Sequence, residues 1–354
     1  MKFKLLTLAL HSLALCSLLA SSGGAFGQSD TIERVGGGRP VRGQIARISP
    51  TAVVVESGGT TQTIKVQDVR KINFGGINGT IRQAISQYYA GSYKDCLDSI
   101  ERNKEKPTKK YIVAELAYCK AMSMAGEAMS GGNVTLKAAK SELNTFITTH
   151  GDSYRYYPAS FAFSQLCVAL GDFDVAKAGF NKVLESDWPT MLLKSRIQLG
   201  MVAFIEKDIS AATNHFSEAI KIDSGDKEAA GLKLVARCRL AQANALSNNG
   251  QNSISEIQKI IKEQSSEDKV LFSNAYNALG HCQKKAGNNK EAVLAFLHTQ
   301  LLYPNQADAQ AEALHELYQL WNSLNYTDRA REAQNLLRRS YRNTYYGNPD
   351  ITRK

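Results

Sequence analysis

Apolar and polar residues follow two different periods along this 354-residue chain. Between Thr31 and Phe74 they alternate with a period of two, and glycine or proline residues separate the short alternating stretches. Such alternation is typical of β-strands with one buried face. From Thr80 onward, apolar residues recur every three or four positions, which is typical of amphipathic α-helices. The pattern therefore predicts a small β-rich domain followed by a long helical region.

The clearest helical unit runs from Asp268 to Pro304. Its first half places apolar side chains on one helix face, at Leu271, Ala275, Leu279 and Cys282. Gly287-Asn288-Asn289 then interrupts the pattern with residues that tolerate turn geometry. A second helical pattern follows, and Pro304 ends it because proline cannot continue a helix. The unit predicts a helical hairpin.

The same unit resembles the tetratricopeptide repeat (TPR), whose signature combines a Leu-Gly pair, an alanine, an aromatic residue and a closing proline at fixed offsets. The residues that carry this resemblance are Leu279-Gly280, Gly287, Ala292, Phe296 and Pro304. Gly280 would let two helices cross closely, Ala292 would let the partner helix lie against it, and Phe296 would fill the gap toward the next repeat. The alternative is an ordinary helical hairpin with the same spacing by chance.

Weaker copies of the unit surround it. Corresponding small residues lie 43, 37, 36 and 38 residues apart in the pairs Cys96/Ala139, Ala139/Ala176, Ala176/Ala212 and Ala292/Ala330. These intervals lie near the family's period of about 34 residues. The interval of 80 between Ala212 and Ala292 requires one more hairpin over residues 226–268, whose motif residues have drifted. Residues 80–341 are thus expected to form about seven TPR-like hairpins, in a mainly α fold with a right-handed α-solenoid.

Residues 28–74 are expected to hold five short strands in a small, strongly bent sheet or barrel. The arrangement resembles the SH3-like and Sm-like barrels, including Gly43 early in a strand where a barrel must bend. Basic residues in this segment are offset by acidic ones, and Phe74 is its only aromatic residue. Because single-stranded nucleic acid is usually bound by aromatic stacking, the domain is interpreted first as a docking module and nucleic-acid binding is disfavoured.

Three further segments connect or end these regions. Residues 75–79 contain three glycines and are predicted to be a linker that hinges the sheet onto the helices. Residues 126–135 are interpreted as an insertion between two helices of one repeat. Residues 342–354 are predicted to be a flexible basic tail.

Residues 1–27 have the pattern of a secretory signal peptide, with Lys2 and Lys4 before an apolar run and small residues near Gly27. A membrane anchor is the competing interpretation, but the run is short and is interrupted by polar residues. A lipid anchor on Cys16 is disfavoured because the preceding Leu15 is large. Cleavage near Gly27 would leave a protein in the periplasm or secreted, with no transmembrane segment.

Charge and cysteine content narrow the possible partners. Loss of Lys2 and Lys4 would lower the formal net charge from +10 to +8, a modest excess that favours acidic partners. The five remaining cysteines are odd in number and irregularly spaced, so they are expected to be buried and unpaired: Cys96, Cys119, Cys167, Cys238 and Cys282. No CxxC pair occurs, which argues against a structural zinc site.

No sequence motif points to catalysis. The chain lacks a phosphate-binding loop of the GxxxxGK type, an HExxH motif and a GxSxG motif. No two histidines lie three or four residues apart on a predicted helix. We therefore expect no enzymatic activity, no cofactor, no metal and no small-molecule substrate.

A TPR solenoid has a concave wall, lined by the first helix of each hairpin, on which a peptide or a partner helix can lie. In the clearest unit this helix carries a polar stripe, Asn274, Asn277, His281 and Lys284. Asparagine can bind a peptide backbone and lysine can pair with a carboxylate, so the stripe is a candidate peptide-binding site. The alternative is a face that is merely solvated.

The leading functional hypothesis is a non-enzymatic protein-interaction scaffold in an extracytoplasmic compartment, with a protein or peptide partner on the concave surface. The alternative is a protein that binds the cell wall or a polyanion, including nucleic acid, through its basic surface and the β domain. An enzyme hidden in the β domain is the least favoured hypothesis.

Overall fold

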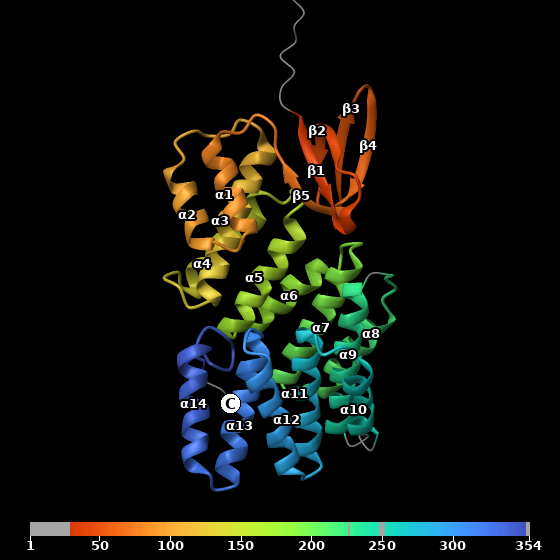
Figure 1. Cartoon of the computed structure of the whole chain (residues 1–354), viewed down its shortest axis with the longest axis vertical. Coiled ribbons are helices and arrows are strands. Elements are labelled where there is room, and N and C mark those ends of the chain that lie inside the picture. Colours follow the sequence, from red (N-terminus) through yellow and green to blue (C-terminus); the bar gives the residue numbers. More distant parts are fainter. Residues whose placement is uncertain (1–28, 226, 248–251, 352–354) are drawn as a thin grey trace, which may run out of the picture.

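The computed structural model describes residues 29–225, 227–247 and 252–351. The predicted signal peptide and the predicted turn at Asn248–Gly250 lie outside these ranges. The chain begins with a small antiparallel sheet and continues as a helical solenoid (Figure 1). The predicted fold class, a mainly α solenoid of TPR-like hairpins preceded by a small β domain, is confirmed. Among the described residues, none of the helices is both long and apolar enough to span a bilayer.

The sheet has five strands in the order β4-β3-β2-β1-β5. Their bounds are β1 Asp30–Arg34, β2 Val41–Ile48, β3 Ala52–Ser57, β4 Thr60–Lys65 and β5 Val69–Asn73. The first four strands follow one another as a meander, and β5 returns to pair with β1. The alternating pattern buries one face, with Ile32, Val53 and Ile72 fully inside. Each strand is therefore where the period of two predicts it.

Gly43 marks the bend of the sheet. Residues 41–43 of β2 pair with β1, whereas residues 44–48 pair with β3. A Cβ atom on Gly43 would lie 2.2 Å from the carbonyl oxygen of Glu56 and 2.7 Å from a methyl of Val55. Only glycine fits at this position, because the backbone of β3 approaches β2 closely where β2 changes its partner strand. This agrees with the bend expected at Gly43.

The described residues form fourteen helices. Their bounds are α1 Gly79–Tyr89, α2 Tyr93–Arg102, α3 Lys110–Met129, α4 Leu136–Thr149, α5 Tyr156–Leu170, α6 Phe173–Val183, α7 Pro189–Ile205, α8 Ile209–Lys221, α9 Lys227–Leu246, α10 Ser253–Glu263, α11 Lys269–Lys285, α12 Asn289–Leu302, α13 Ala307–Ser323 and α14 Thr327–Ser340. Consecutive helices pack as seven hairpins, and each first helix also contacts the first helix of the next hairpin. In the drifted repeat, the helical pattern of the sequence predicts a first helix over Lys227–Leu246, and α9 has the same bounds.

The glycine and the aromatic residue of the TPR-like pattern fit each other within one hairpin. A Cβ atom on Gly280 of α11 would lie 2.6 Å from the ring of Phe296 on α12, and Gly200 stands in the same relation to Phe216 at 2.5 Å. Phe296 is fully buried and also reaches the apolar residues of the following hairpin. The glycine therefore leaves space for an aromatic ring. This ring packs between the two helices of the hairpin and against the next repeat.

The segment expected to be an insertion is partly helix. Residues 126–129 are the last turn of α3, and only residues 130–135 form the turn before α4. Position 126 in this last turn requires a glycine, because a Cβ atom there would lie 2.3 Å from the ring of Tyr93. The prediction of an insertion over the whole of residues 126–135 is thus wrong.

The sheet and the helices share one hydrophobic core, in which Ile32 and Ile72 of the sheet join Ile81 of α1 and Cys119 of α3. The buried carboxylate of Asp30 accepts hydrogen bonds from the backbone N–H of Ile45 at 3.2 Å and of Gly75 at 2.8 Å. It also accepts one from the hydroxyl of Tyr111 on α3 at 3.2 Å. The shared core and Asp30 therefore hold the sheet against the helices. Residues 75–79 connect the two parts, and their role as a hinge stays a prediction.

Residues Arg342–Ile351, the C-terminal segment, return from the last hairpin to the second and third (Figure 1). Thr344 and Asn348 are buried, at 2% and 5% exposure. The segment folds as consecutive turns, held by hydrogen bonds such as that from the N–H of Asn348 to the carbonyl of Thr344. Over these residues the prediction of a flexible tail is wrong, because the segment has fixed partners in α3 and α5.

Candidate functional site: the concave groove

A cavity of about 430 Å³ lies on the concave side of the solenoid. The first helices of five hairpins form its wall, α5, α7, α9, α11 and α13, and the C-terminal segment forms one side. Its lining combines apolar side chains with carboxamides and charges: Phe161, Gln165, Lys194, Ile197, Gln198, Met201, Arg239, Asn274, Asp308, Glu312, Tyr345 and Tyr346. Each of these helices contributes between two and five residues to the lining. This composition suits a peptide, which presents both backbone amides and side chains.

Arg239 of α9 and Glu312 of α13 form a buried ion pair at one end of this groove. Two guanidinium nitrogens of Arg239 donate to the two carboxylate oxygens of Glu312, at 2.8 and 2.7 Å. Both side chains are almost fully inside, at 1% and 4% exposure. Arg239 also donates to the amide oxygens of Asn274 and Gln242. A buried charge pair is tolerated only when such additional hydrogen bonds satisfy its remaining groups.

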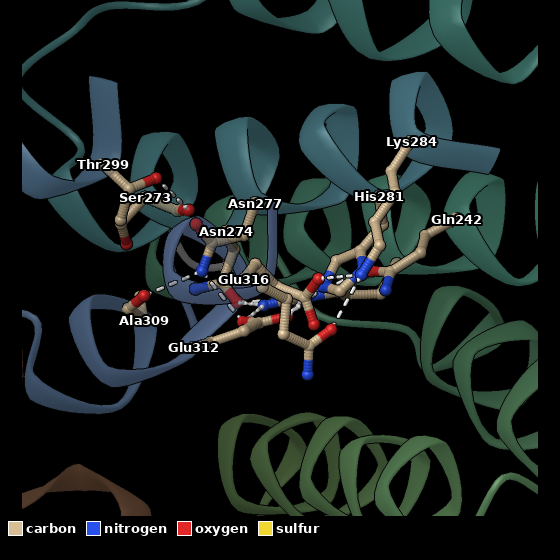
Figure 2. A network of polar contacts seen from close by, with 12 residues as sticks. Gln242, Ser273, Asn274, Asn277, His281, Lys284, Thr299, Ala309, Glu312 and Glu316 are labelled. Carbon is tan, nitrogen blue, oxygen red and sulfur yellow. Dashed lines mark hydrogen bonds and ion pairs between the residues drawn. The ribbon is translucent and has the colours of Figure 1, made fainter. Parts of the chain in front are cut away.

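The predicted stripe on α11 faces this ion pair (Figure 2). Asn277 is fully buried, and its side-chain amide donates to Glu312 at 2.8 Å and to the carbonyl of Ala309 at 2.9 Å. His281 lies 2.9 Å from the other carboxylate oxygen of Glu312. Lys284 donates to Glu316 at 2.5 Å and to Gln319 at 3.0 Å. These three residues therefore bind α13, and the interpretation of the stripe as a solvated face is wrong for Asn277.

Of the four stripe residues, Asn274 alone lines the cavity. Its oxygen accepts from Arg239 at 2.9 Å, and its amide nitrogen donates to the carbonyl of Val270. Peptide binding by the stripe stays a prediction, and within the groove it would involve Asn274.

Opposite effects act on the acidic groups of the groove. Burial alone would raise the pKa of Glu312, but the charge of Arg239 and hydrogen bonds from His281 and Arg239 outweigh it and hold that pKa well below its usual range. Asp308, on the first turn of α13, has an exposed side chain inside the concave wall. Glu312 is thus committed to the structure, whereas Asp308 remains available to a ligand.

A second buried ion pair supports the other half of the solenoid. Glu115 of α3, fully buried, accepts from Arg155 at 3.2 Å and from the hydroxyl of Tyr154 at 2.7 Å. The guanidinium of Arg155 lies over the rings of Tyr154 and Tyr118, with 4.4 and 4.9 Å to their centroids. Neither ion pair is predicted by the apolar periodicity of the helices. One sequence feature does indicate the buried acids: each lies three positions after an apolar residue on the first helix of a hairpin, where a core residue is expected. Glu115 follows Ile112 in this way, and Glu312 follows Ala309.

All five cysteines of the described residues are buried and free, as expected. Burial raises the pKa of the Cys238 and Cys282 thiols to about 12, which keeps them protonated and unreactive.

The sequence matches no protein-family model and no curated protein. Among solved structures, the chain is similar to a Rap protein complexed with competence and sporulation factor, at 13% identity and a TM-score of 0.48 over 77% of each chain. It is also similar to the C-terminal part of a TPR repeat-containing protein from Cytophaga hutchinsonii, at 13% identity and a TM-score of 0.41 over 77% of this chain and 96% of that one. A third is PilW, a widely conserved type IV pilus biogenesis factor, at 14% identity and a TM-score of 0.41 over 68% of this chain and 99% of that one. None of these similarities identifies a family for the chain.

Proposed function

We propose that this protein is a non-enzymatic interaction scaffold in an extracytoplasmic compartment, and that its concave groove binds a peptide segment of a partner protein. The observation that carries the proposal is the groove itself. It is a cavity of about 430 Å³ with mixed lining, and a segment of the protein's own chain already packs along one side.

The lining offers separate contacts for each part of a peptide. The carboxamides of Gln165 and Gln198 can both donate to and accept from a peptide backbone. Asp308 on α13 can pair with a basic side chain. Lys194 on α7, which lies 2.6 Å from Glu228, adds a positive charge to the lining. Apolar side chains between them, such as Ile197 and Met201, can bury an aliphatic or aromatic residue of the partner.

The test places a photo-crosslinking amino acid at Gln198, inside the groove, in the full chain expressed in its own host. The matched position is Arg331 on α14, whose side chain is 70% exposed and outside the groove lining. We expect Gln198 to capture one discrete protein that Arg331 does not capture. Recovery of the same proteins from both positions would contradict the proposal.

A second part of the crosslinking test compares two aspartates that occupy the same position in their helices. Asp308 and Asp328 each lie in the first turn of a helix, where a negative charge interacts favourably with the helix dipole. Only Asp308 lines the groove. Asp308→Ala should lower the yield of the crosslink from Gln198, and Asp328→Ala should leave it unchanged. Equal loss in both variants would show that folding, and not contact with a ligand, is affected.

The extracytoplasmic part of the proposal rests on residues 1–27. It is tested by the mass of the amino-terminal peptide of the protein recovered from its host. Cleavage near Gly27 together with export supports it, and an intact amino terminus in the cytoplasmic fraction contradicts it.

A further inference from the structure

The C-terminal segment is attached to the ends of α3 and α5 through two asparagines. The side-chain amide of Asn343 donates to the carbonyl of Ala128 at 2.8 Å, and that of Asn348 donates to the carbonyl of Ala169 at 2.9 Å. Ala128 and Ala169 lie in the last two residues of α3 and α5, where carbonyl groups have no partner within the helix. Two successive repeats therefore present the same acceptor, and asparagines five residues apart reach both.

Aromatic rings occupy the space between these two contacts. The ring of Tyr345 packs on Phe173 of α6, with 5.3 Å between centroids, and the ring of Tyr346 packs on His315 of α13 at 5.0 Å. Tyr346 also joins the apolar cluster of the last hairpin. The segment thus touches the second, third and seventh hairpins at once.

The same residues are part of the cavity wall. Thr344, Tyr345 and Tyr346 line the groove together with Gln165 and Asp308. Removal of the segment would uncover this side of the groove and the carbonyl of Ala169, which accepts from Asn348. A partner with a similar arrangement of side chains could then make the same contacts.

We propose that the C-terminal segment is an internal competitor for the groove. A partner segment with two carboxamide side chains flanking aromatic residues, in the manner of Asn343, Tyr345, Tyr346 and Asn348, binds in its place. This inference rests on the proposed function and specifies the chemistry of the peptide and its regulation. Because only the fraction of molecules with the segment released can bind, the full chain has a lower apparent affinity than a chain without it.

The test uses the segment itself as the ligand. A fluorescent peptide with the sequence of residues 342–354 is titrated against the full chain and against a chain that ends at Tyr341. We expect saturable binding to the shortened chain and binding weaker by at least about tenfold to the full chain. A peptide with Asn343→Ala and Asn348→Ala, and one of scrambled sequence, should bind neither. Equal binding to both chains would overturn the inference, as would no binding to a shortened chain whose helical circular dichroism is intact.

A second variant covers the case in which the shortened chain does not fold. The full chain with Asn343→Ala and Asn348→Ala keeps every helix and loses the two attachments. Its matched control carries Asn305→Ala and Asn335→Ala, two exposed asparagines outside the groove lining. The first variant should bind the labelled peptide more tightly than the wild type, and the control should not. Identical affinities in the two variants would overturn the inference.

Failure of this inference can be told apart from failure of the proposed function. If the peptide binds only the shortened chain while Gln198 captures no partner, the groove serves the C-terminal segment alone and the proposed function fails. If Gln198 captures the same amount of partner from the full and the shortened chains and the peptide does not bind, the proposed function stands and the inference is overturned.

Discussion

Arg239 on α9 and Glu312 on α13 make a two-point ion pair in the interior of the solenoid, although 73 residues separate them in the sequence. Their helices belong to hairpins that are two repeats apart, with α11 between them. The pair therefore joins three successive first helices through one set of hydrogen bonds, since Asn274, Asn277 and His281 of α11 complete it. These contacts hold the three helices together where they line the groove.

Removal of the charge of Glu312 should weaken this half of the solenoid. Glu312→Gln keeps the volume but leaves the guanidinium of Arg239 buried without a counter-charge, so we expect a loss of about 3–5 kcal/mol in the free energy of unfolding. Urea denaturation measures it, with the exposed Glu332→Gln as the control. The double variant Arg239→Met with Glu312→Leu should retain more stability than Glu312→Gln. If Glu312→Gln is as stable as the wild type, Arg239 and Glu312 do not form a buried ion pair.

The same carboxylate gives a pH dependence with a definite sign. Folding lowers the pKa of Glu312 from its ordinary value of 4.5, so the folded state binds its proton less readily than the unfolded state. Its contribution to stability is complete above about pH 4.5 and is lost as the pH falls below that value. The difference in unfolding free energy between wild type and Glu312→Gln should therefore shrink on acidification. A difference that grows toward low pH would contradict this assignment.

Gly280 should not tolerate a side chain. In Gly280→Ala the new Cβ would lie 2.6 Å from the ring of Phe296, which is fully buried and cannot withdraw. We expect a loss of about 1–3 kcal/mol by overpacking, measured by thermal or urea unfolding. Gly79→Ala is the control, because a Cβ atom there meets no atom within 4 Å. Alanine has the higher helix propensity, so a Gly280→Ala variant that is no less stable than Gly79→Ala would show that the ring of Phe296 does not require the glycine.

The repeat architecture could be predicted because its signals are local. Apolar spacing within one helix, and small residues such as Ala292 and Gly280 at the crossing of two neighbouring helices, recur from hairpin to hairpin. Even the drifted repeat could be placed, since its first helix keeps the period of 3.6 over Lys227–Leu246. Each of these features depends on residues fewer than about 40 positions apart, within one repeat period.

The site could not be predicted in the same way, because its partners are distant in sequence. Periodicity placed Asn277 on the polar face of α11, but it could not show that Glu312 of the next first helix would cover that face. The C-terminal segment combines glycine, proline and polar residues, which is the composition of a mobile tail. Its partners include the carbonyls of Ala128 and Ala169, and backbone groups leave no signal in a sequence.

Docking of the sheet on the helices provides a last prediction, centred on Asp30. Its carboxylate accepts from β2, from Gly75 and from Tyr111 of α3, so it joins the sheet, the connection and the solenoid. In Asp30→Asn the new amide nitrogen cannot accept, and at least one buried donor loses its partner at a cost of about 1–3 kcal/mol. Hydrogen exchange should then accelerate at the N–H groups of Ile45 and Gly75, and Tyr111→Phe should produce a smaller change. Glu56→Gln, which changes an exposed carboxylate on β3 of the same sheet, should leave both amides protected. Unchanged protection in Asp30→Asn would mean that the shared apolar core alone holds the sheet in place.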